Sequence, residues 1–225
     1  DRDRFMEAYV HLFVKKCEDL DLPPSRSLTG FGHGVRAMLD NDGTMSNEER
    51  FWEAFCSTIG EDIGEKKAMF LEFYRNEFTL LEQVVSSDAN ARLLVLALRK
   101  LGHRVVLATS PLFPREGTLE RIRWARLEPS WFELITTYEE FCYAKPSLGY
   151  YRQVLEKIGV QASECLMIGN DVSEDMVAMS LGMETFLVTD WLINTDNRDT
   201  SMYRQGTLAE AVTFCKGLGP AGSAS

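Results

Sequence analysis

The sequence predicts an α/β fold in which helices cover both faces of a parallel sheet, preceded by a purely helical region. Two observations support this prediction. After residue 86, short apolar runs of the kind that form buried strands alternate with stretches of helical periodicity. Before residue 86, apolar and aromatic residues recur at helical spacing, and no run has the character of a strand. A chain of 225 residues is long enough for one large domain, or for a core that carries an inserted domain.

The first part of the chain is expected to fold as successive helices. Pro23 and Pro24 end the first helix, because proline removes a backbone donor and clashes inside a helix. Ser46 followed by Glu49 has the pattern of a capping box and marks a helix start. The glycine-rich stretch 29–34 has no strand before it, as a dinucleotide-binding loop would require, and is expected to be a flexible loop that enters a helix. The expected helices are 5–20, 35–39, a helix that begins after Ser46, and 65–78.

The second part is expected to alternate between strands and helices. Strands are predicted at 104–108, 132–135, 165–168 and 185–188. Helices are predicted at 88–101, 119–126, 147–158, and from the end of the third strand to Gly182. Gly102, Gly159 and Gly182 follow these helices at positions typical of a C-cap. The tail 217–225 consists of small and turn-forming residues and is expected to be disordered.

The net charge and the cysteines indicate which kinds of binding partner and which cellular compartment to expect. The formal net charge of −10 argues against a nucleic-acid partner, since nucleic-acid phosphates require clustered Lys and Arg. A phosphorylated small molecule is compatible, because a metal ion and a few local cations can reverse the field inside a cleft. No apolar run is long enough to span a bilayer, so no membrane partner is expected. The five cysteines are scattered, odd in number and without C-x-x-C spacing, which favours reduced thiols in a cytoplasmic protein over a disulfide frame or a zinc site.

Polar residues stand just past the predicted strands or on the adjoining loops. Thr109 and Ser110 follow the first predicted strand, where a hydroxyl can hydrogen-bond a phosphoryl oxygen. Lys145 precedes a helix, and an ammonium there can neutralise charge on a nucleophile and on a phosphoryl group. Asp171 and Asp175 follow the third strand, at the carboxyl end where open α/β sheets bind ligands.

The spacing of Asp171 and Asp175 is consistent with a metal site. Residues four apart lie one above the other on a helix. Two close carboxylates repel each other unless a cation or a proton lies between them, so a hard divalent ion such as Mg²⁺ is the natural partner. The alternative is an ordinary helix start, whose acids are favoured by the helix dipole. These residues alone leave both alternatives open.

Taken in this order, the polar residues and the apolar strands before them resemble three motifs of the haloacid dehalogenase superfamily of hydrolases. One family motif is an apolar strand that ends in Thr or Ser, and residues 105–109 are similar to it. The family's Lys, often followed by Pro, is similar to Lys145 and Pro146, and its acidic motif G-N-D-x-x-x-D is similar to 169–175. The resemblance covers 88–188 directly. It implies a Rossmann-like α/β core over 86–216, with a helical cap over 1–85 that is inserted after the first core strand.

The resemblance also implies a role for each residue. Asp171 would bind Mg²⁺, and Asp175 would support the metal shell or orient Lys145. Thr109 would hold a phosphoryl oxygen with Ser110 nearby, and Lys145 would bridge the nucleophile and the phosphate. The implied function is a Mg²⁺-dependent phosphatase that hydrolyses a small phosphorylated metabolite through an aspartyl-phosphate. The alternatives are a dehalogenase or phosphomutase on the same fold, or an inactive binding or scaffold protein.

The family's first motif, an apolar strand followed by D-x-D, has no convincing match. Residues 40–44 copy the letters D-x-D-G-T, but a helix is expected before them, so a polar turn between two cap helices is predicted instead. A segment before Asp1 is expected to carry the nucleophilic Asp, because the neighbouring core strands would otherwise expose backbone groups. His33, Arg36 and Trp52 are candidate substrate contacts in the cap. The alternative for His33 is a place in a surface loop, for Arg36 a solvated helix position, and for Trp52 packing in the core.

Overall fold

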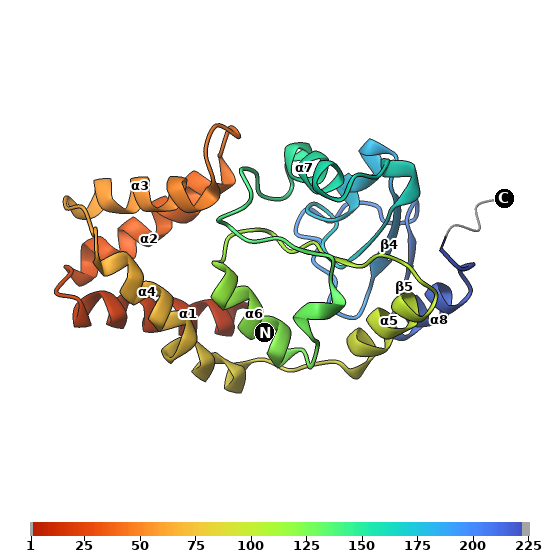
Figure 1. Cartoon of the computed structure of the whole chain (residues 1–225), viewed down its shortest axis with the longest axis horizontal. Helices are drawn as coiled ribbons and strands as arrows, with labels where there is room; N and C mark the ends of the chain where they lie inside the picture. The colour runs from red at the N-terminus through yellow and green to blue at the C-terminus, as the bar shows by residue number, and fades with distance from the viewer. Residues whose placement is uncertain (1, 222–225) are drawn as a thin grey trace. The chain divides into compact units, whose positions relative to one another are not determined.

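The computed structural model describes residues 2–221, and the chain divides into two compact units. The helical unit comprises Asp1–Ser87, Thr109–Leu127 and Thr136–Ala144, and the sheet unit comprises Asp88–Ala108, Glu128–Ile135 and Lys145–Ser225 (Figure 1). The predicted α/β fold is confirmed, whereas the domain boundary after residue 85 stays a prediction. Of the expected tail, residues 222–225 lie outside the described residues. No helix between residues 2 and 221 has the length and hydropathy needed to cross a bilayer.

Aromatic side chains form the core of the helical unit. Its elements are α1 (Arg2–Asp19), α2 (Pro24–Leu39), α3 (Asn47–Ile59), α4 (Lys66–Arg75), the 3-10 helix η1 (Glu77–Val84) and α6 (Arg115–Trp124). Phe13 is almost completely buried, and its ring centre lies 5.2 Å from that of Phe70 and 5.8 Å from that of Phe55. Burying such a side chain contributes roughly 1.5–3 kcal/mol to stability. The capping box predicted between Ser46 and Glu49 is confirmed at the start of α3.

The glycine-rich stretch 29–34 is the middle of α2, so the expected flexible loop is wrong. The helix begins at Pro24, where proline is tolerated because a first-turn N–H has no helical partner. A Cβ on Gly30 would lie 3.0 Å from the Phe55 ring, and a Cβ on Gly34 would lie 2.5 Å from the Phe51 ring. These two glycines lie one turn apart on one face of α2 and let it approach α3 closely. The contact offsets the low helix propensity of glycine.

Residues 40–44 form the polar turn that was predicted between two helices. Asp42 Oδ1 accepts hydrogen bonds from the Thr44 hydroxyl (2.7 Å), the Thr44 backbone N–H (3.1 Å) and Arg50 (2.7 Å). The bonds from Thr44, followed by the one from Arg50, lower the pKa of Asp42 to about 2. Asp40 stands at the C-cap of α2, so it ends a helix and does not follow a strand. The turn therefore lacks the setting that a nucleophilic D-x-D motif requires.

All strand pairs of the sheet unit are parallel among the described residues. Its strands are β1 (Val106–Leu107), β2 (Leu134–Ile135), β3 (Leu166–Gly169), β4 (Glu184–Val188) and β5 (Arg204–Gly206). Its helices are α5 (Ala89–Lys100), α7 (Leu148–Ile158), α8 (Leu208–Lys216) and the 3-10 helices η2 (Pro129–Trp131), η3 (Ala162–Glu164) and η4 (Met176–Leu181). β1 pairs with β2, and β3 pairs with β4, which pairs with β5. The four predicted strands are found at their predicted places, the first two of them shortened.

Two parts of the sheet unit differ from the sequence prediction. The helix expected between β3 and Gly182 is a turn over 172–175 followed by η4. The Asp175 carboxylate accepts backbone N–H groups at the start of this segment, which favours a turn over a regular helix. β5 and α8 were not predicted. β5 lacks the apolar run by which strands were recognised. α8 does carry a sequence signal that was overlooked, the capping box between Thr207 and Glu210.

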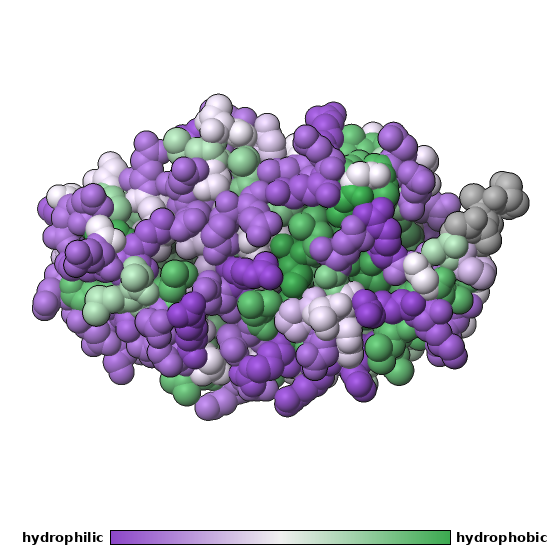
Figure 2. All heavy atoms as spheres, viewed as in Figure 1, coloured by the Kyte–Doolittle hydropathy of each residue, from purple (hydrophilic) through white to green (hydrophobic). Residues whose placement is uncertain are grey.

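The strands of the sheet unit differ in burial. β4 is buried from Thr185 to Val188, whereas β1 and β3 are only half-buried although their residues are apolar. In the view of Figure 2, apolar surface gathers over the sheet unit. Central strands of parallel sheets are usually buried on both faces. The half-burial of β1 and β3 is therefore unusual for strands of this composition.

Candidate active site

The loop at the carboxyl end of β3 is built around the Asp175 carboxylate. Asp175 Oδ2 accepts hydrogen bonds from the backbone N–H groups of Asn170 and Asp171, each at 3.0 Å. In return, the Asp175 backbone N–H donates to the Asp171 carbonyl oxygen at 2.9 Å. A Cβ on Gly169 would lie 2.1 Å from Asp175 Oδ2, so only glycine permits this approach. The G-N-D-x-x-x-D pattern thus encodes a closed turn at the strand tip.

Lys145 and Asp175 form a buried ion pair within the sheet unit. Lys145 Nζ donates to Asp175 Oδ1 at 2.6 Å, and the two residues are only 4% and 6% exposed. The ammonium lies 5.6 Å from the ring centre of Tyr150 and 5.8 Å from that of Tyr151. Burial, assisted by the nearby Asp175 charge, raises the pKa of Tyr151, which donates a 2.6 Å hydrogen bond to the Glu174 carbonyl oxygen. The contact fits the role of orienting Lys145, and the catalytic role itself stays a prediction.

Asp171 has the chemistry of a single metal ligand. Its Oδ1 accepts hydrogen bonds from the backbone N–H groups of Ser173 (2.9 Å) and Glu174 (2.8 Å), which fix the carboxylate. Its Oδ2 has no hydrogen-bond partner among the described residues. Mg²⁺ in proteins is commonly held by one or two carboxylates together with waters and substrate phosphate, so a half-buried carboxylate with one available oxygen fits such a site. Residues 2–221 contain no group of three or more His, Cys, Asp or Glu side chains that could hold a metal.

A loop after β4 is fastened to the same strand tip, which the sequence reasoning missed. The Asn170 side chain donates to the Trp191 carbonyl oxygen, and the Ile193 N–H donates to the Asn170 carbonyl oxygen at 2.8 Å. Val172 N–H donates to the Ile193 carbonyl oxygen at 3.0 Å. The Trp191 side chain is 63% exposed. The Asn of the G-N-D pattern was the available signal, because its side chain needs a polar partner beside the strand.

Thr109 and Ser110 belong to the helical unit. The fully buried Thr136 hydroxyl donates to the Thr109 carbonyl oxygen at 2.5 Å. The Ser110 carbonyl oxygen accepts the Leu112 N–H at 2.8 Å, which makes the following turn tight. Ser110 Oγ is buried and has no hydrogen-bond partner in the described part of the chain, so its hydrogen-bonding capacity is unused. The convergence of Thr109 and Ser110 with Lys145 and Asp171 stays a prediction.

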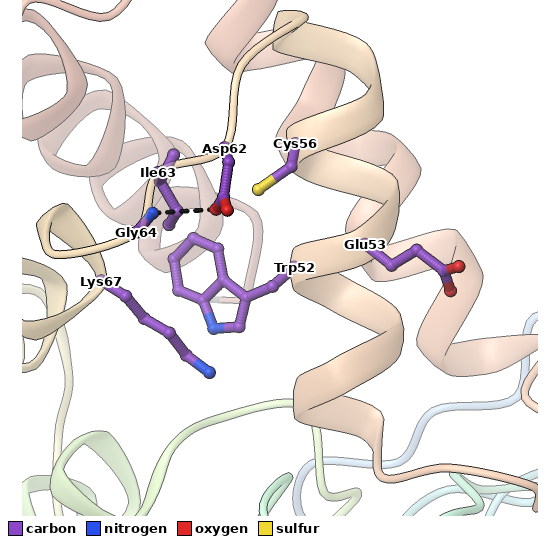
Figure 3. A pocket seen from close by; sticks show the side chains of 7 residues that line it. All are labelled: Trp52, Glu53, Cys56, Asp62, Ile63, Gly64 and Lys67. Atoms are coloured by element: carbon purple, nitrogen blue, oxygen red, sulfur yellow. Dashed lines mark hydrogen bonds between the residues drawn. The ribbon is translucent and has the colours of Figure 1, made fainter.

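The three candidate substrate contacts in α2 and α3 differ in their surroundings. His33 Nδ1 lies 2.9 Å from the Thr58 hydroxyl, and Arg36 forms an exposed (i, i+4) ion pair with Asp40. Trp52 is buried in the aromatic core and borders a pocket of about 350 Å³ in the helical unit (Figure 3). The pocket is lined by Trp52, Glu53, Cys56, Asp62, Ile63, Gly64 and Lys67. Among these three candidates, the pocket involves Trp52 alone.

Comparison with known proteins places the chain among hydrolases. A model of haloacid dehalogenase-like hydrolases matches residues 6–180. A glyceraldehyde 3-phosphate phosphatase of Methanothermobacter thermautotrophicus is 22% identical over 172 residues, which are 72% of this chain and 69% of that protein.

Solved structures show the same fold. A HAD phosphatase from Thermococcus onnurineus superposes with a TM-score of 0.57 at 18% identity, covering 94% of this chain and 90% of its own. An L-2-haloacid dehalogenase from Xanthobacter autotrophicus, with chloropropionic acid covalently bound, superposes with a TM-score of 0.52 at 12% identity, covering 93% and 86%. Because the family model spans more than half of the sequence, the chain belongs to the haloacid dehalogenase-like hydrolases.

Proposed function

We propose that this hydrolase is a Mg²⁺-dependent phosphatase that acts on a small phosphorylated metabolite. The buried Lys145–Asp175 pair next to Asp171, at the carboxyl end of β3, carries the proposal. A preorganised ammonium beside a carboxylate that can bind Mg²⁺ suits the charge that develops during phosphoryl transfer. The glyceraldehyde 3-phosphate phosphatase name of one relative supports the substrate class. The five free cysteines support a reducing, cytoplasmic environment.

The proposed reaction has two displacements at phosphorus. In the proposal, the first Asp of a D-x-D motif carried by a segment before Asp1 attacks the phosphorus and the bond to the substrate oxygen breaks, while the second Asp of that motif gives its proton to the departing alcohol. The second Asp, now ionised, takes a proton from the water that attacks the aspartyl-phosphate, and phosphate leaves as the first carboxylate is restored. The edge of β3 opposite β4 pairs with no strand among the described residues, and β1 and β3 are half-buried, which supports a further strand there.

The residues of this chain have complementary roles in the proposal. Lys145 holds the nucleophile and the phosphate close together, and Asp175 holds the ammonium in place through the 2.6 Å hydrogen bond. Thr109 and Ser110 donate hydrogen bonds to phosphoryl oxygens. Asp171 holds Mg²⁺, which supplies positive charge to the phosphoryl oxygens when bound. Residues 1–85 form the cap that selects the substrate.

The proposal is tested by phosphate release from p-nitrophenyl phosphate by the full-length protein, with Mg²⁺ and with EDTA. Lys145→Ala is expected to lower turnover by about a hundredfold or more, the scale of losing one preorganised charged group. Lys100→Ala, which removes an exposed lysine from the last turn of α5, is the matched control and is expected to leave turnover unchanged. Circular dichroism of both variants checks that they are folded.

Each other outcome contradicts a defined part of the proposal. Unchanged turnover in a folded Lys145→Ala variant would remove this lysine from the mechanism. Halide release from 2-haloacids without Mg²⁺ would replace the phosphatase by a dehalogenase. The absence of both activities in the full-length wild type would favour a non-catalytic binding protein.

A further inference from the structure

Arg121 on α6 is a half-buried cation without a counter-ion in the described part of the chain. Its guanidinium carbon lies 4.8 Å from the centre of the Phe113 ring. Phe113 in turn packs against Tyr9, at 5.3 Å between ring centres, and against Phe78, at 6.0 Å. Within the described residues, no Asp or Glu forms an ion pair with Arg121, and no acceptor forms a hydrogen bond with it.

Two nearby arginines, Arg123 on α6 and Arg126 just after it, do form ion pairs. Arg123 contacts Glu120 at 2.7 Å and Glu82 at 3.4 Å, and Arg126 contacts Glu82 at 3.5 Å. Residues two apart on a helix point about 200° away from each other, so Arg121 faces away from these acids. The contrast with Arg123 shows that the missing partner is a property of the Arg121 position.

The groups around Arg121 do not compensate its charge. Burial lowers the pKa of Arg121, which reflects how poorly its surroundings solvate the cation. Tyr9 and Tyr74 share a buried 2.6 Å hydrogen bond, and burial raises the pKa of both phenols, so they stay neutral at physiological pH. The contact with the Phe113 ring is weaker than a charge-assisted hydrogen bond to an anion. Arg121 is therefore poised to bind an anionic group.

Arg121 is connected to the candidate phosphate-binding loop through Phe113. Ser110, whose hydroxyl is buried without a partner, precedes Phe113 by three residues, a stretch of chain that spans at most about 11 Å. The Phe113 carbonyl oxygen accepts the Tyr138 N–H at 3.1 Å, and this bond fixes the end of the loop. Among the described residues, Ser110 Oγ has no partner at one end of this segment, and the unpaired Arg121 guanidinium packs on Phe113 at its other end.

We propose that Arg121 recognises a second anionic group of the substrate, a carboxylate or a further phosphate, while Ser110 faces the phosphate that is cleaved. This inference rests on the proposed phosphatase function and narrows its substrate class to phosphate esters that carry two anionic groups. The planar guanidinium offers two parallel N–H donors to such a group. Arg121 is thereby a specificity residue, which contacts the substrate away from the reacting phosphorus.

The test compares Arg121→Gln with Arg123→Gln in the full-length protein, because the two changes remove the same charge from the same helix. The probes are p-nitrophenyl phosphate, with one anionic group, 3-phosphoglycerate, with a carboxylate, and fructose 1,6-bisphosphate, with a second phosphate. Arg121→Gln is expected to raise KM at least about tenfold for one or both two-anion probes, the scale of a hydrogen-bonded charge, and to leave p-nitrophenyl phosphate unchanged. Arg123→Gln is expected to change none of the three. Arg121→Lys, which keeps the charge but not the fork, is expected to fall between wild type and Arg121→Gln.

The outcomes separate this inference from the phosphatase proposal. A wild type that hydrolyses none of the probes contradicts the phosphatase proposal, and binding of the two-anion probes, measured by calorimetry, then decides the role of Arg121 alone. Binding weakened by Arg121→Gln and not by Arg123→Gln supports the inference. Equal effects of Arg121→Gln on all three probes, no effect on any, or no binding of a two-anion probe by the wild type would overturn it.

Discussion

Asp175 divides its carboxylate between a lysine and the backbone. One oxygen accepts from Lys145, and the other accepts two N–H groups of the loop after β3. A single side chain therefore both compensates the buried ammonium and shapes the turn that presents Asp171. The residues alone placed Lys145 before a helix and Asp175 after the third predicted strand, and only the family resemblance suggested that Asp175 orients Lys145. Lys145 and Asp175 are 30 residues apart, and the folded sheet unit brings them together.

Asp175→Asn is expected to lower the free energy of unfolding by about 3–5 kcal/mol. The amide can still accept from the backbone, but Lys145 becomes a buried charge without a partner. Urea denaturation measures the loss. Asp196→Asn, at an exposed ion pair with Arg198, is the control and is expected to change stability by less than about 0.5 kcal/mol. Adding Lys145→Met to Asp175→Asn should recover part of the loss, and no recovery would contradict this explanation.

At the scale of an element, α2 shows how a glycine pattern can have two meanings. The same letters suit a loop or a helix that packs closely on a neighbour, and the sequence does not show which residues face Gly30 and Gly34. The aromatic rings of Phe51 and Phe55 on α3 decide the matter, since they occupy the space where side chains would stand. Tertiary packing here overrides the helix propensity of glycine.

Gly34→Ala and Gly32→Ala are expected to have opposite effects on stability. A Cβ at 34 would lie 2.5 Å from the Phe51 ring, and the forced displacement is expected to cost about 1–3 kcal/mol. A Cβ at 32 would meet no atom within 4 Å, so alanine is expected to stabilise α2 by up to about 1 kcal/mol. Thermal unfolding of both variants measures the difference. Destabilisation of equal size in both would contradict the packing explanation.

For the whole molecule, the sequence predicted the helices and strands more fully than it predicted which of them pack or pair together. Apolar runs and helical periodicity were enough for the α/β class and for β1 to β4. β5 was missed because Arg204 and Gln205 carry no apolar signal, and its place depends on pairing with β4. The candidate site residues were predicted from their positions near strand ends and from the family resemblance. Arg121 was not singled out, because an arginine in an ordinary helix has no distinguishing sequence pattern.

The two units can be followed separately through buried thiols. Cys17 lies in the helical unit and Cys215 in the sheet unit, both are fully buried, and burial raises the pKa of each to about 11. Each is therefore expected to react with a thiol reagent at least about a hundredfold more slowly than the half-buried Cys56 in the native protein, because the thiolate is scarce and covered. Mass spectrometry after timed labelling measures the rates. If Cys17 and Cys215 become labelled at different urea concentrations, the two units unfold independently. Equally fast labelling of Cys17, Cys215 and Cys56 in the native protein would contradict the burial of the two cores.

Gly169 contributes no functional group, yet it controls the position of those that do. Any larger residue there would occupy the volume of the Asp175 oxygen, which would have to swing away and leave Lys145 without its anchor. Under the proposed mechanism, a single methyl group there is expected to inactivate the hydrolase while leaving every charged side chain in the sequence intact. Surveys that judge natural variants only by whether the acidic and basic motif residues are retained would overlook this kind of inactivation.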